Sequence, residues 1–337
     1  MPRAGLRSTL LATAVASVVA ASAMIMRAQA APQVVSSDST GVVDVNTNLG
    51  YQAGTAAGTG IVVSGSGEVL TNNHVIRGAT SLHATVVGTG RTYTATVLGY
   101  SVASDVAVIK LNGASGLKTA SLGKSGSLKV GQSVTAVGNA GGLGGAPSVT
   151  TGHVTALHRA ITVVDGFGGS ERLTDLIKSS ASVQPGDSGG PLLDAAGHVV
   201  GVTTAAAGGF RFENGGTSGY AIPIDDAMSL AGQILAKRSS ANVHVGPTAF
   251  LGVLTHPTSE VTGALIQAVV PGSAADKAGI NEGDVITGFN GRTVGSAKAL
   301  TAAVLSIKPG TRVQVRWLSP SGVRFQAFAR PAAGPPQ

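Results

Sequence analysis

The sequence predicts a mostly β protein with two folded domains, and three observations support this. The length of 337 residues corresponds to two domains at roughly 150 residues each. Only 12% of residues are charged and 4% are aromatic, while glycine occurs 49 times, a composition typical of short strands joined by tight turns. Short runs rich in β-branched residues also recur at regular spacing. This spacing favours a β-sandwich or a β-barrel.

The first predicted domain follows a leader and covers residues 31–238. Its expected strands are Gly60–Val63, Glu68–Leu70, Thr94–Leu98, Val106–Leu111, Ser133–Val137, Val149–Leu157 and His198–Thr203. Helical periodicity is clear only over Ile224–Arg238, where Ala227, Leu230 and Ile234 recur at helical spacing. We therefore expect this helix to close the domain, with residues 239–248 as a linker.

The second predicted domain covers residues 249–331 and mixes strands with helices. Strands are expected over Ala264–Val269 and Thr311–Leu318. A short helix is expected over Ala274–Ala278 and a longer one over Ser296–Ile307. Residues 332–337 are expected to form a flexible tail.

The first thirty residues have the pattern of a secretory signal. Arg3 and Arg7 precede an apolar run from Leu10 to Met26, and a small-x-small sequence ends at Ala30. We expect cleavage after Ala30 and a secreted or cell-envelope protein. The alternative is an uncleaved membrane anchor, because the apolar run approaches the length that spans a bilayer.

Charge and cysteine content exclude several classes of function. Removing residues 1–30 takes away three arginines and no acid, which lowers the net charge from +7 to +4. The remaining basic residues are scattered, so we expect no nucleic-acid partner. The absence of cysteine excludes disulfides, thiolate zinc sites and a cysteine nucleophile. None of the seven histidines has a partner at metal-ligand spacing, so we expect no metal and no cofactor.

A serine flanked by glycines carries the strongest chemical signal. Gly186-Asp187-Ser188-Gly189-Gly190-Pro191 places a hydroxyl in a turn where glycines allow unusual backbone conformations. A serine nucleophile needs a base to take its proton and donors to stabilise the oxyanion. We expect Ser188 to be the nucleophile and the Gly186 and Ser188 amides to form the oxyanion hole.

One histidine and one aspartate have suitable positions to complete this machinery. His74 directly follows a predicted strand, and Asp105 opens the strand that begins at Val106. A buried Asp105 would orient the imidazole of His74 and stabilise its protonated form. The order histidine, aspartate, serine differs from that of the α/β-hydrolases.

These motifs resemble those of the HtrA (Deg) family of chymotrypsin-fold serine proteases. The resemblance rests on Thr71-Asn72-Asn73-His74-Val75, on Asp105-Val106-Ala107-Val108 and on Gly186 to Pro191, and it extends to a C-terminal segment similar to the family's PDZ domain. It implies a two-barrel protease domain followed by a small α+β PDZ domain. It also implies a serine endopeptidase that cuts unfolded or partly folded proteins, and a homo-trimer.

By the same resemblance, Ser182 lies at the base of the primary specificity pocket. A serine there supplies no charge, and Val183, Thr203 and Ala205 suggest a modest apolar pocket. We expect cleavage after small or medium aliphatic residues.

The resemblance assigns a peptide site to the second domain. The amides of the segment Phe250, Leu251, Gly252 and Val253 would capture the carboxylate at a peptide C-terminus. Leu251 and Val253, together with Leu300 on the longer helix, would line a hydrophobic slot.

Two positions depart from the family pattern and two rival functions stay open. Asp187 stands where many HtrA proteins have asparagine, and Ser180 stands where they have an aspartate. A non-catalytic peptide-binding chaperone and a protease activated by ligand at the PDZ domain are the alternatives to a constitutively active endopeptidase.

Overall fold

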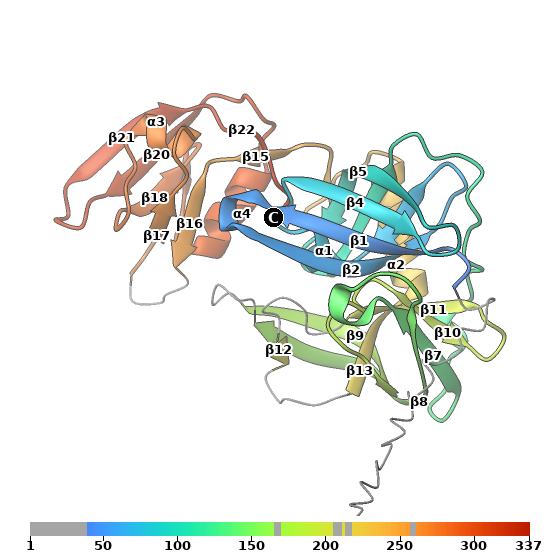
Figure 1. Ribbon diagram of the computed structural model, residues 1–337. Helices are drawn as coiled ribbons and strands as arrows, with labels where there is room; N and C mark the ends of the chain where they lie inside the picture. Colours follow the sequence, from blue (N-terminus) through green and yellow to red (C-terminus); the bar gives the residue numbers. More distant parts are fainter. Residues whose placement is uncertain (1–38, 165–169, 205–210, 213–217, 257–260) are drawn as a thin grey trace, which may run out of the picture. The chain divides into compact units, whose positions relative to one another are not determined.

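The computed structural model describes residues 39–164, 170–204, 211–212, 218–256 and 261–337 (Figure 1). The predicted signal lies outside this range, as does Ala205 of the predicted specificity pocket. In the described part of the chain, no helix is both long enough and apolar enough to cross a membrane.

The first half of the first predicted domain forms a closed barrel of six strands. These are β1 (Val42–Leu49), β2 (Gly54–Val62), β3 (Glu68–Thr71), β4 (Ser81–Val86), β5 (Arg91–Ser101) and β6 (Val106–Leu111). They pair in the order β5-β4-β1-β2-β3-β6, and pairing of β5 with β6 closes the ring.

A second barrel follows, built from six further strands. They are β7 (Ser133–Gly138), β8 (Ser148–Val164), β9 (Ser170–Ser182), β10 (Pro191–Asp194), β11 (Val199–Thr204) and β13 (Ser218–Pro223). The order is β8-β7-β10-β11-β13-β9, β8 pairs with β9 to close it, and β12 (Arg211–Phe212) extends β8. The expected two-barrel fold is therefore confirmed.

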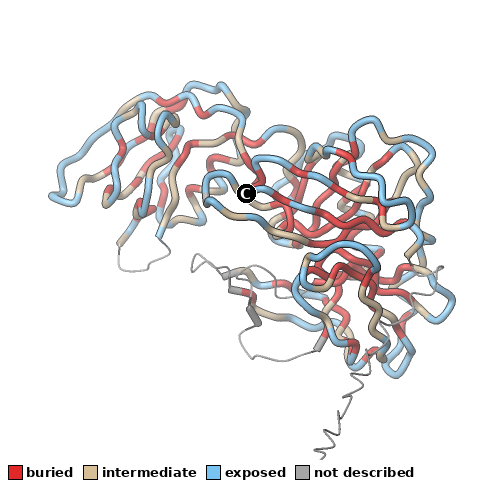
Figure 2. Tube along the Cα trace, viewed as in Figure 1, coloured by how far each residue is buried: buried red, intermediate tan, exposed pale blue. Residues whose placement is uncertain are grey.

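Burial explains why these segments form strands. Four of the six residues of β6 are β-branched or alanine, and all of the strand except Lys110 is buried; all six residues of β11 are buried too (Figure 2). One apolar cluster takes side chains from both barrels, including Ile61 of the first and Val202 of the second. The junction between the barrels is thus part of the core, which gives the residues at this junction a rigid frame.

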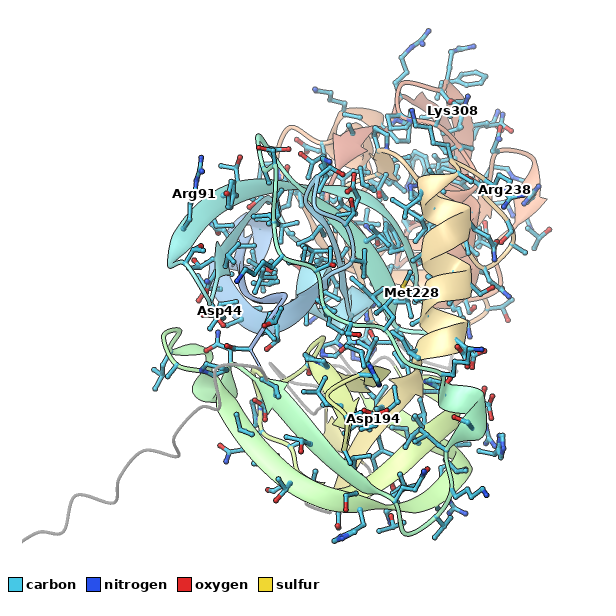
Figure 3. The ribbon with its side chains drawn as sticks, turned by 90° about the vertical axis from the view of Figure 1, so that its right-hand side faces the viewer. Asp44, Arg91, Asp194, Met228, Arg238 and Lys308 are labelled. Atoms are coloured by element: carbon cyan, nitrogen blue, oxygen red, sulfur yellow. The ribbon has the colours of Figure 1, made fainter. Side chains whose placement is uncertain are left out.

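Helix α2 (Ile224–Leu235) covers this core. Ile224, Ala227, Ala231 and Ile234 recur at helical spacing and are buried in the shared cluster. Figure 3 shows the helix running alongside the barrels, with Met228 on it. The helix ends three residues earlier than expected, because Ala236 and Lys237 leave the helical conformation and Lys237 has a positive φ of 55°.

The second domain is a small α+β unit with its own core. Its sheet contains β16 (Val253–His256), β17 (Ala264–Val269), β18 (Val285–Phe289), β19 (Arg292–Thr293), β20 (Val313–Leu318) and β21 (Arg324–Ala329). The strands run in the order β16-β17-β18-β20-β21, with β19 paired to β18, so β16 is an edge strand of this sheet within the described ranges.

Its two helices begin where capping serines stand. The side chain of Ser273 accepts from Asp276 N at the start of α3 (Ala274–Ala278), and that of Ser296 accepts from Ala299 N at the start of α4 (Ala297–Leu305). Both helices fall where the sequence predicts them. Shorter 3-10 turns occur at Gly50–Gln52, Ser125–Ser127 and Ala140–Gly142.

The linker and the tail differ from expectation. Within the expected linker, β14 (His244–Val245) pairs with β5, and β15 (Thr248–Phe250) begins at the linker's last residue. The expected flexible tail instead contains β22 (Ala332–Gly334), which pairs with β15. Pro335 and Pro336, which directly precede Gln337, are buried. Backbone pairing with segments more than eighty residues away orders the tail, and its local composition carries no sign of that pairing.

Candidate active site

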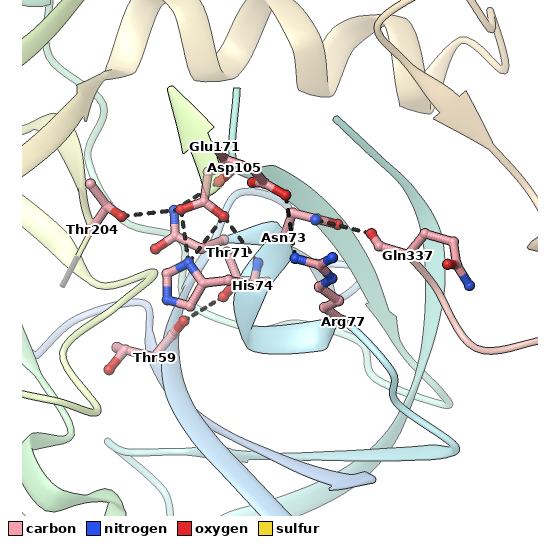
Figure 4. A network of polar contacts seen from close by, with 10 residues as sticks. Thr59, Thr71, Asn73, His74, Arg77, Asp105, Glu171, Thr204 and Gln337 are labelled. Atoms are coloured by element: carbon pink, nitrogen blue, oxygen red, sulfur yellow. Dashed lines mark hydrogen bonds and ion pairs between the residues drawn. The ribbon is translucent and has the colours of Figure 1, made fainter. Parts of the chain in front are cut away.

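His74 lies on α1 (Asn73–Ile76), the short helix that follows β3, and its ring faces Asp105 (Figure 4). Its Nδ1 lies 2.8 Å from Asp105 Oδ2 and 3.0 Å from Asp105 Oδ1. The His74 backbone N–H also donates to Asp105 Oδ1 at 3.0 Å. An ionised carboxylate can only accept, so the proton of neutral His74 sits on Nδ1 and leaves Nε2 as the basic nitrogen.

Asp105 is fixed by contacts from three sides. Asn72 Nδ2 donates to its backbone oxygen at 2.8 Å, and Thr204 Oγ1 donates to its Oδ2 at 3.1 Å. Its backbone has a φ of 52°, which is unusual outside glycine and is maintained here by these partners. The side chains of His74 and Asp105 are each 3% exposed, so water competes little for the bond between them.

The nucleophile turn depends on its glycines. Gly186 has a φ of 100°, and a Cβ there would lie 2.0 Å from the backbone oxygen of Asn139. Gly189 has a φ of 85°, and a Cβ there would lie 2.1 Å from Thr59 O. No L side chain fits at either position, so steric exclusion explains why both are glycine.

Contacts of Thr59 and Gly58 place Ser188 next to the segment that contains His74. Thr59 N donates to Ser188 O at 2.7 Å. A Cβ on Gly58 would lie 2.6 Å from Val75 Cγ2 and 3.1 Å from Ser188 O, so the backbone of the serine and the neighbour of His74 pack around one glycine. The fold therefore brings together the His74 segment of the first barrel and the Ser188 turn of the second.

Strand β11 links the serine turn to the aspartate. Thr203 O accepts from Gly189 N at 2.8 Å, and the next residue, Thr204, donates to Asp105. The adjacent residues Thr203 and Thr204 therefore fix the serine turn and Asp105 relative to each other. Thr204 and Thr59 were missed by sequence reasoning, since a threonine in a strand carries no local sign of a bond across the barrel junction.

Thr59 organises the loop that faces the serine. Its hydroxyl donates to Gly186 O at 2.7 Å and accepts from Asn139 N at 2.9 Å. Fixing Gly186 O orients the peptide group that follows it. That peptide group carries the Asp187 N–H, so the contact helps to fix the turn between the two predicted oxyanion-hole amides.

The predicted specificity residues have different environments. Ser182 is exposed at the end of β9, Val183 is half-buried, and Thr203 is buried. A Cβ on Gly219 would lie 2.7 Å from Val183 Cγ2, so β13 lies next to that side chain. Ser180 accepts from His153 N at 3.0 Å, a bond between neighbouring strands.

In the second domain, the predicted carboxylate site lies beside Gly252. The oxygens of Leu251 and Gly252 accept from Ala275 N and Val270 N, both at 2.9 Å. Within a trans peptide the N–H points opposite to the C=O, so the amides of Gly252 and Val253 point away from these partners. These amides adjoin the edge strand β16, where an added strand can pair.

The residues predicted to line the hydrophobic slot differ in how far they are exposed. Leu251 and Leu300 are 3% and 2% exposed and belong to the core of the second domain. Phe250 and Val253 remain half-buried and keep surface that a ligand can contact. Among the described residues, no group of three or more acidic or histidine side chains could hold a metal ion.

Comparison with known proteins agrees with this geometry. Residues 58–202 match the trypsin-like peptidase domain, and residues 249–318 match the PDZ domain. The chain is 37% identical over 294 residues to the serine protease PepD of Mycobacterium tuberculosis, covering 83% of this chain and 61% of the relative. It is 38% identical to a probable periplasmic serine endoprotease, DegP-like, of Chlamydia muridarum, covering 77% of this chain and 50% of the relative.

A solved structure gives the same assignment. The HtrA-type protease AlgW with a tripeptide is 25% identical, with a TM-score of 0.51, and the match covers 90% of this chain and 98% of that one. The protein is therefore a trypsin-like peptidase domain followed by a PDZ domain. It is similar in domain order and sequence to HtrA-type serine proteases, in agreement with the resemblance of its motifs. The chain spans between half and about three fifths of the length of the two curated relatives given above.

Proposed function

We propose that this protein is a serine endopeptidase that hydrolyses peptide bonds of unfolded or partly folded proteins. The observation that carries the proposal is the His74–Asp105 pair, held at 2.8 Å and buried beside the turn of Ser188. In the proposed reaction, His74 Nε2 takes the proton of Ser188 Oγ as that oxygen attacks the carbonyl carbon. The amides of Gly186 and Ser188 stabilise the resulting oxyanion. His74 then protonates the leaving amine, and water hydrolyses the acyl-enzyme by the same route.

The proposed substrates and location follow from the family and the leader. The chlamydial relative is named as periplasmic, and residues 1–30 have the pattern of a secretory signal. We place the protein outside the cytoplasm, released by cleavage after Ala30. The PDZ domain would bind C-terminal peptides along β16, and the family resemblance adds a trimer.

The proposal is tested by labelling and by mapping of cleavage sites. A fluorophosphonate probe should label the purified protein at Ser188, and Ser188→Ala should abolish both labelling and cleavage of an unfolded protein such as reduced casein. Mass spectrometry of the products should show cuts after small or medium aliphatic residues. Absence of labelling in a folded protein, with retained suppression of aggregation, would instead identify a peptide-binding chaperone. Preferred cuts after lysine or arginine would contradict the proposed pocket.

One observation favours a second candidate, a ligand-activated protease. Ser188 is 0% exposed and the side chain of His74 is 3% exposed, so a substrate reaches them only after part of the surrounding surface moves. If a C-terminal peptide bound beside Gly252 drives that movement, its addition should raise the rate of fluorophosphonate labelling. A labelling rate that does not change at saturating peptide would favour constitutive activity.

A further inference from the structure

Asp187, the residue before the candidate nucleophile, has a buried carboxylate whose partners are uncharged. The residue is 3% exposed. Its Oδ1 accepts from Ser148 Oγ at 2.6 Å, and its Oδ2 accepts from Gln184 N at 2.8 Å. Burial raises the pKa of Asp187, and the bonds from Ser148 and Gln184 partly oppose this rise. A buried carboxylate needs such donors, because ionisation without them is strongly disfavoured.

The space for this carboxylate is built into the neighbouring strand. A Cβ on Gly138 of β7 would lie 2.5 Å from Asp187 Oδ1 and 2.6 Å from Asp187 Cα. The Ser148 hydroxyl, at the start of β8, also lies 3.0 Å from Gly138 O. A hydroxyl has one proton, and the ionised Asp187 is both the nearer and the stronger acceptor.

Asp187 also closes the turn that contains Ser188. Its backbone N–H donates to Gln184 O at 3.0 Å, and its backbone oxygen accepts from Gly190 N at 3.0 Å. With Oδ2 on Gln184 N, the residue binds both ends of the segment 184–190. The peptide group that joins Asp187 to Ser188 carries the Ser188 amide, and the bonds between Asp187 and Gln184 close the short segment that carries the Gly186 amide. Displacement of Asp187 would therefore disturb both amides.

We propose that Ser148 is a positioning residue for the hydrolysis: its hydroxyl holds Asp187, and Asp187 holds the oxyanion-hole amides of the 184–190 turn in their working orientation. This inference rests on the proposed function. Ser148 lies 40 residues before Ser188 and acts through Asp187, without contact with substrate. The sequence motif identifies Asp187 as a departure from the family pattern, and the tertiary structure supplies its partner.

The test combines two substitutions in a double-mutant cycle. Ser148→Ala should lower kcat/KM by about tenfold, less than the 10²- to 10³-fold typical of losing an oxyanion donor outright. In an Asp187→Ala background, the same Ser148→Ala change should alter kcat/KM by less than about twofold, because no side-chain acceptor for the Ser148 hydroxyl remains. Ser148→Thr, which keeps a hydroxyl, should restore most of the activity. Thr151→Ala, at an exposed position of β8, is the matched control.

The pH profile separates positioning from general damage to the fold. Among the residues that the structure describes, Ser148, the Gln184 amide and Gly138 lie against the Asp187 carboxylate, and none of them titrates or carries a charge. Loss of a bond to the ionised form raises a carboxyl pKa further. The acid limb of kcat/KM should thus move to higher pH in Ser148→Ala and stay in place in the Thr151→Ala control.

The outcomes distinguish this inference from the proposed function. Wild-type protein that neither labels nor cleaves would overturn the proposed endopeptidase, whatever Ser148 does. Wild-type protein that cleaves, together with a Ser148→Ala variant of unchanged rate and pH profile, would overturn only the positioning role. An equal loss in both backgrounds would also overturn it. Thermal melting of each variant identifies any loss that follows from unfolding.

Discussion

At the scale of single residues, the site is a set of buried polar groups whose partners lie far away in the sequence. Asp105 takes bonds from Asn72, His74 and Thr204, which come from the end of β3, from α1 and from β11. These bonds matter to the site because an unpaired polar group in the interior is costly. Replacement of any one of these residues would leave a buried partner without its hydrogen bond.

Asp105→Asn tests the orientation of His74. An amide at this position can donate to Nδ1 and would favour the neutral tautomer that carries its proton on Nε2, the wrong nitrogen for a base. We expect kcat/KM to fall by about 10³- to 10⁴-fold with little change in KM. Steady-state kinetics on a peptide substrate would measure this. A loss of less than about tenfold would show that Asp105 does not orient the base.

Asp44 on β1 has a titration that should be visible in stability. Burial raises its pKa from 3.8 to about 6, against the opposing bond from the Gly145 amide. The folded state therefore binds the proton more tightly than the unfolded state, and stability due to Asp44 falls as the pH rises from about 4 to about 6.

Asp44→Asn should remove this dependence. The variant should gain about 3 kcal/mol relative to wild type between pH 4 and pH 7, an upper value for a shift of this size. Urea unfolding of both proteins across this range measures the difference directly. A difference in stability that does not change with pH would contradict the raised pKa.

At the scale of elements, the two glycines of the serine turn allow a backbone path that no other residue could follow. Gly186 lies against Asn139 O, and Gly189 lies against Thr59 O. Both neighbours are backbone atoms of other segments, so they cannot move aside as a side chain can. The turn and its surroundings form a single rigid element.

Gly186→Ala should therefore disable the turn. Its φ of 100° disfavours alanine, and the added Cβ would collide with Asn139 O at 2.0 Å. We expect fluorophosphonate labelling to fall by at least about 100-fold, because the oxyanion hole is lost with the turn's shape. Gly131→Ala is a useful control, since Gly131 also has a positive φ but nothing lies within 4 Å of its Cβ position. Equal labelling of Gly186→Ala and wild type would refute the assignment.

At the scale of the whole molecule, the chain has separate apolar cores for its two domain types. One cluster joins both barrels beneath α2, and another fills the PDZ domain around Ile266, Phe289 and Trp317. A substitution in the PDZ core should consequently act on that domain first.

Leu300→Ala tests this separation. Leu300 is 2% exposed in the PDZ core, and truncation of a buried leucine costs about 2–5 kcal/mol. Calorimetry should show a transition that moves to lower temperature, while the labelling rate of Ser188 at 25 °C stays near that of wild type. A parallel loss of labelling would show that the PDZ domain supports the protease site.

The strands, helices and chemical motifs could be predicted because each has a local cause. A run rich in β-branched residues predicted β6 with its exact bounds, β17 and α3 were also predicted with theirs, and apolar spacing predicted α4 to within two residues at each end. The glycines around Ser188 identified the candidate nucleophile, since their conformational demands depend on the residues themselves. His74 and Asp105 could be singled out for the same reason, by their places next to predicted strands.

Pairing between distant segments could be decided only in three dimensions. Residues 332–337 carry no local sign of strand structure, yet β22 pairs with β15, more than eighty residues away. Thr204 reaches Asp105 across the junction between the barrels, and Ser148 reaches Asp187 within the second barrel, because packing of the strands brings these distant residues together. Local preference determines which segments extend or coil. The choice of partner depends on how all the segments share one interior, and no single stretch of sequence contains that information.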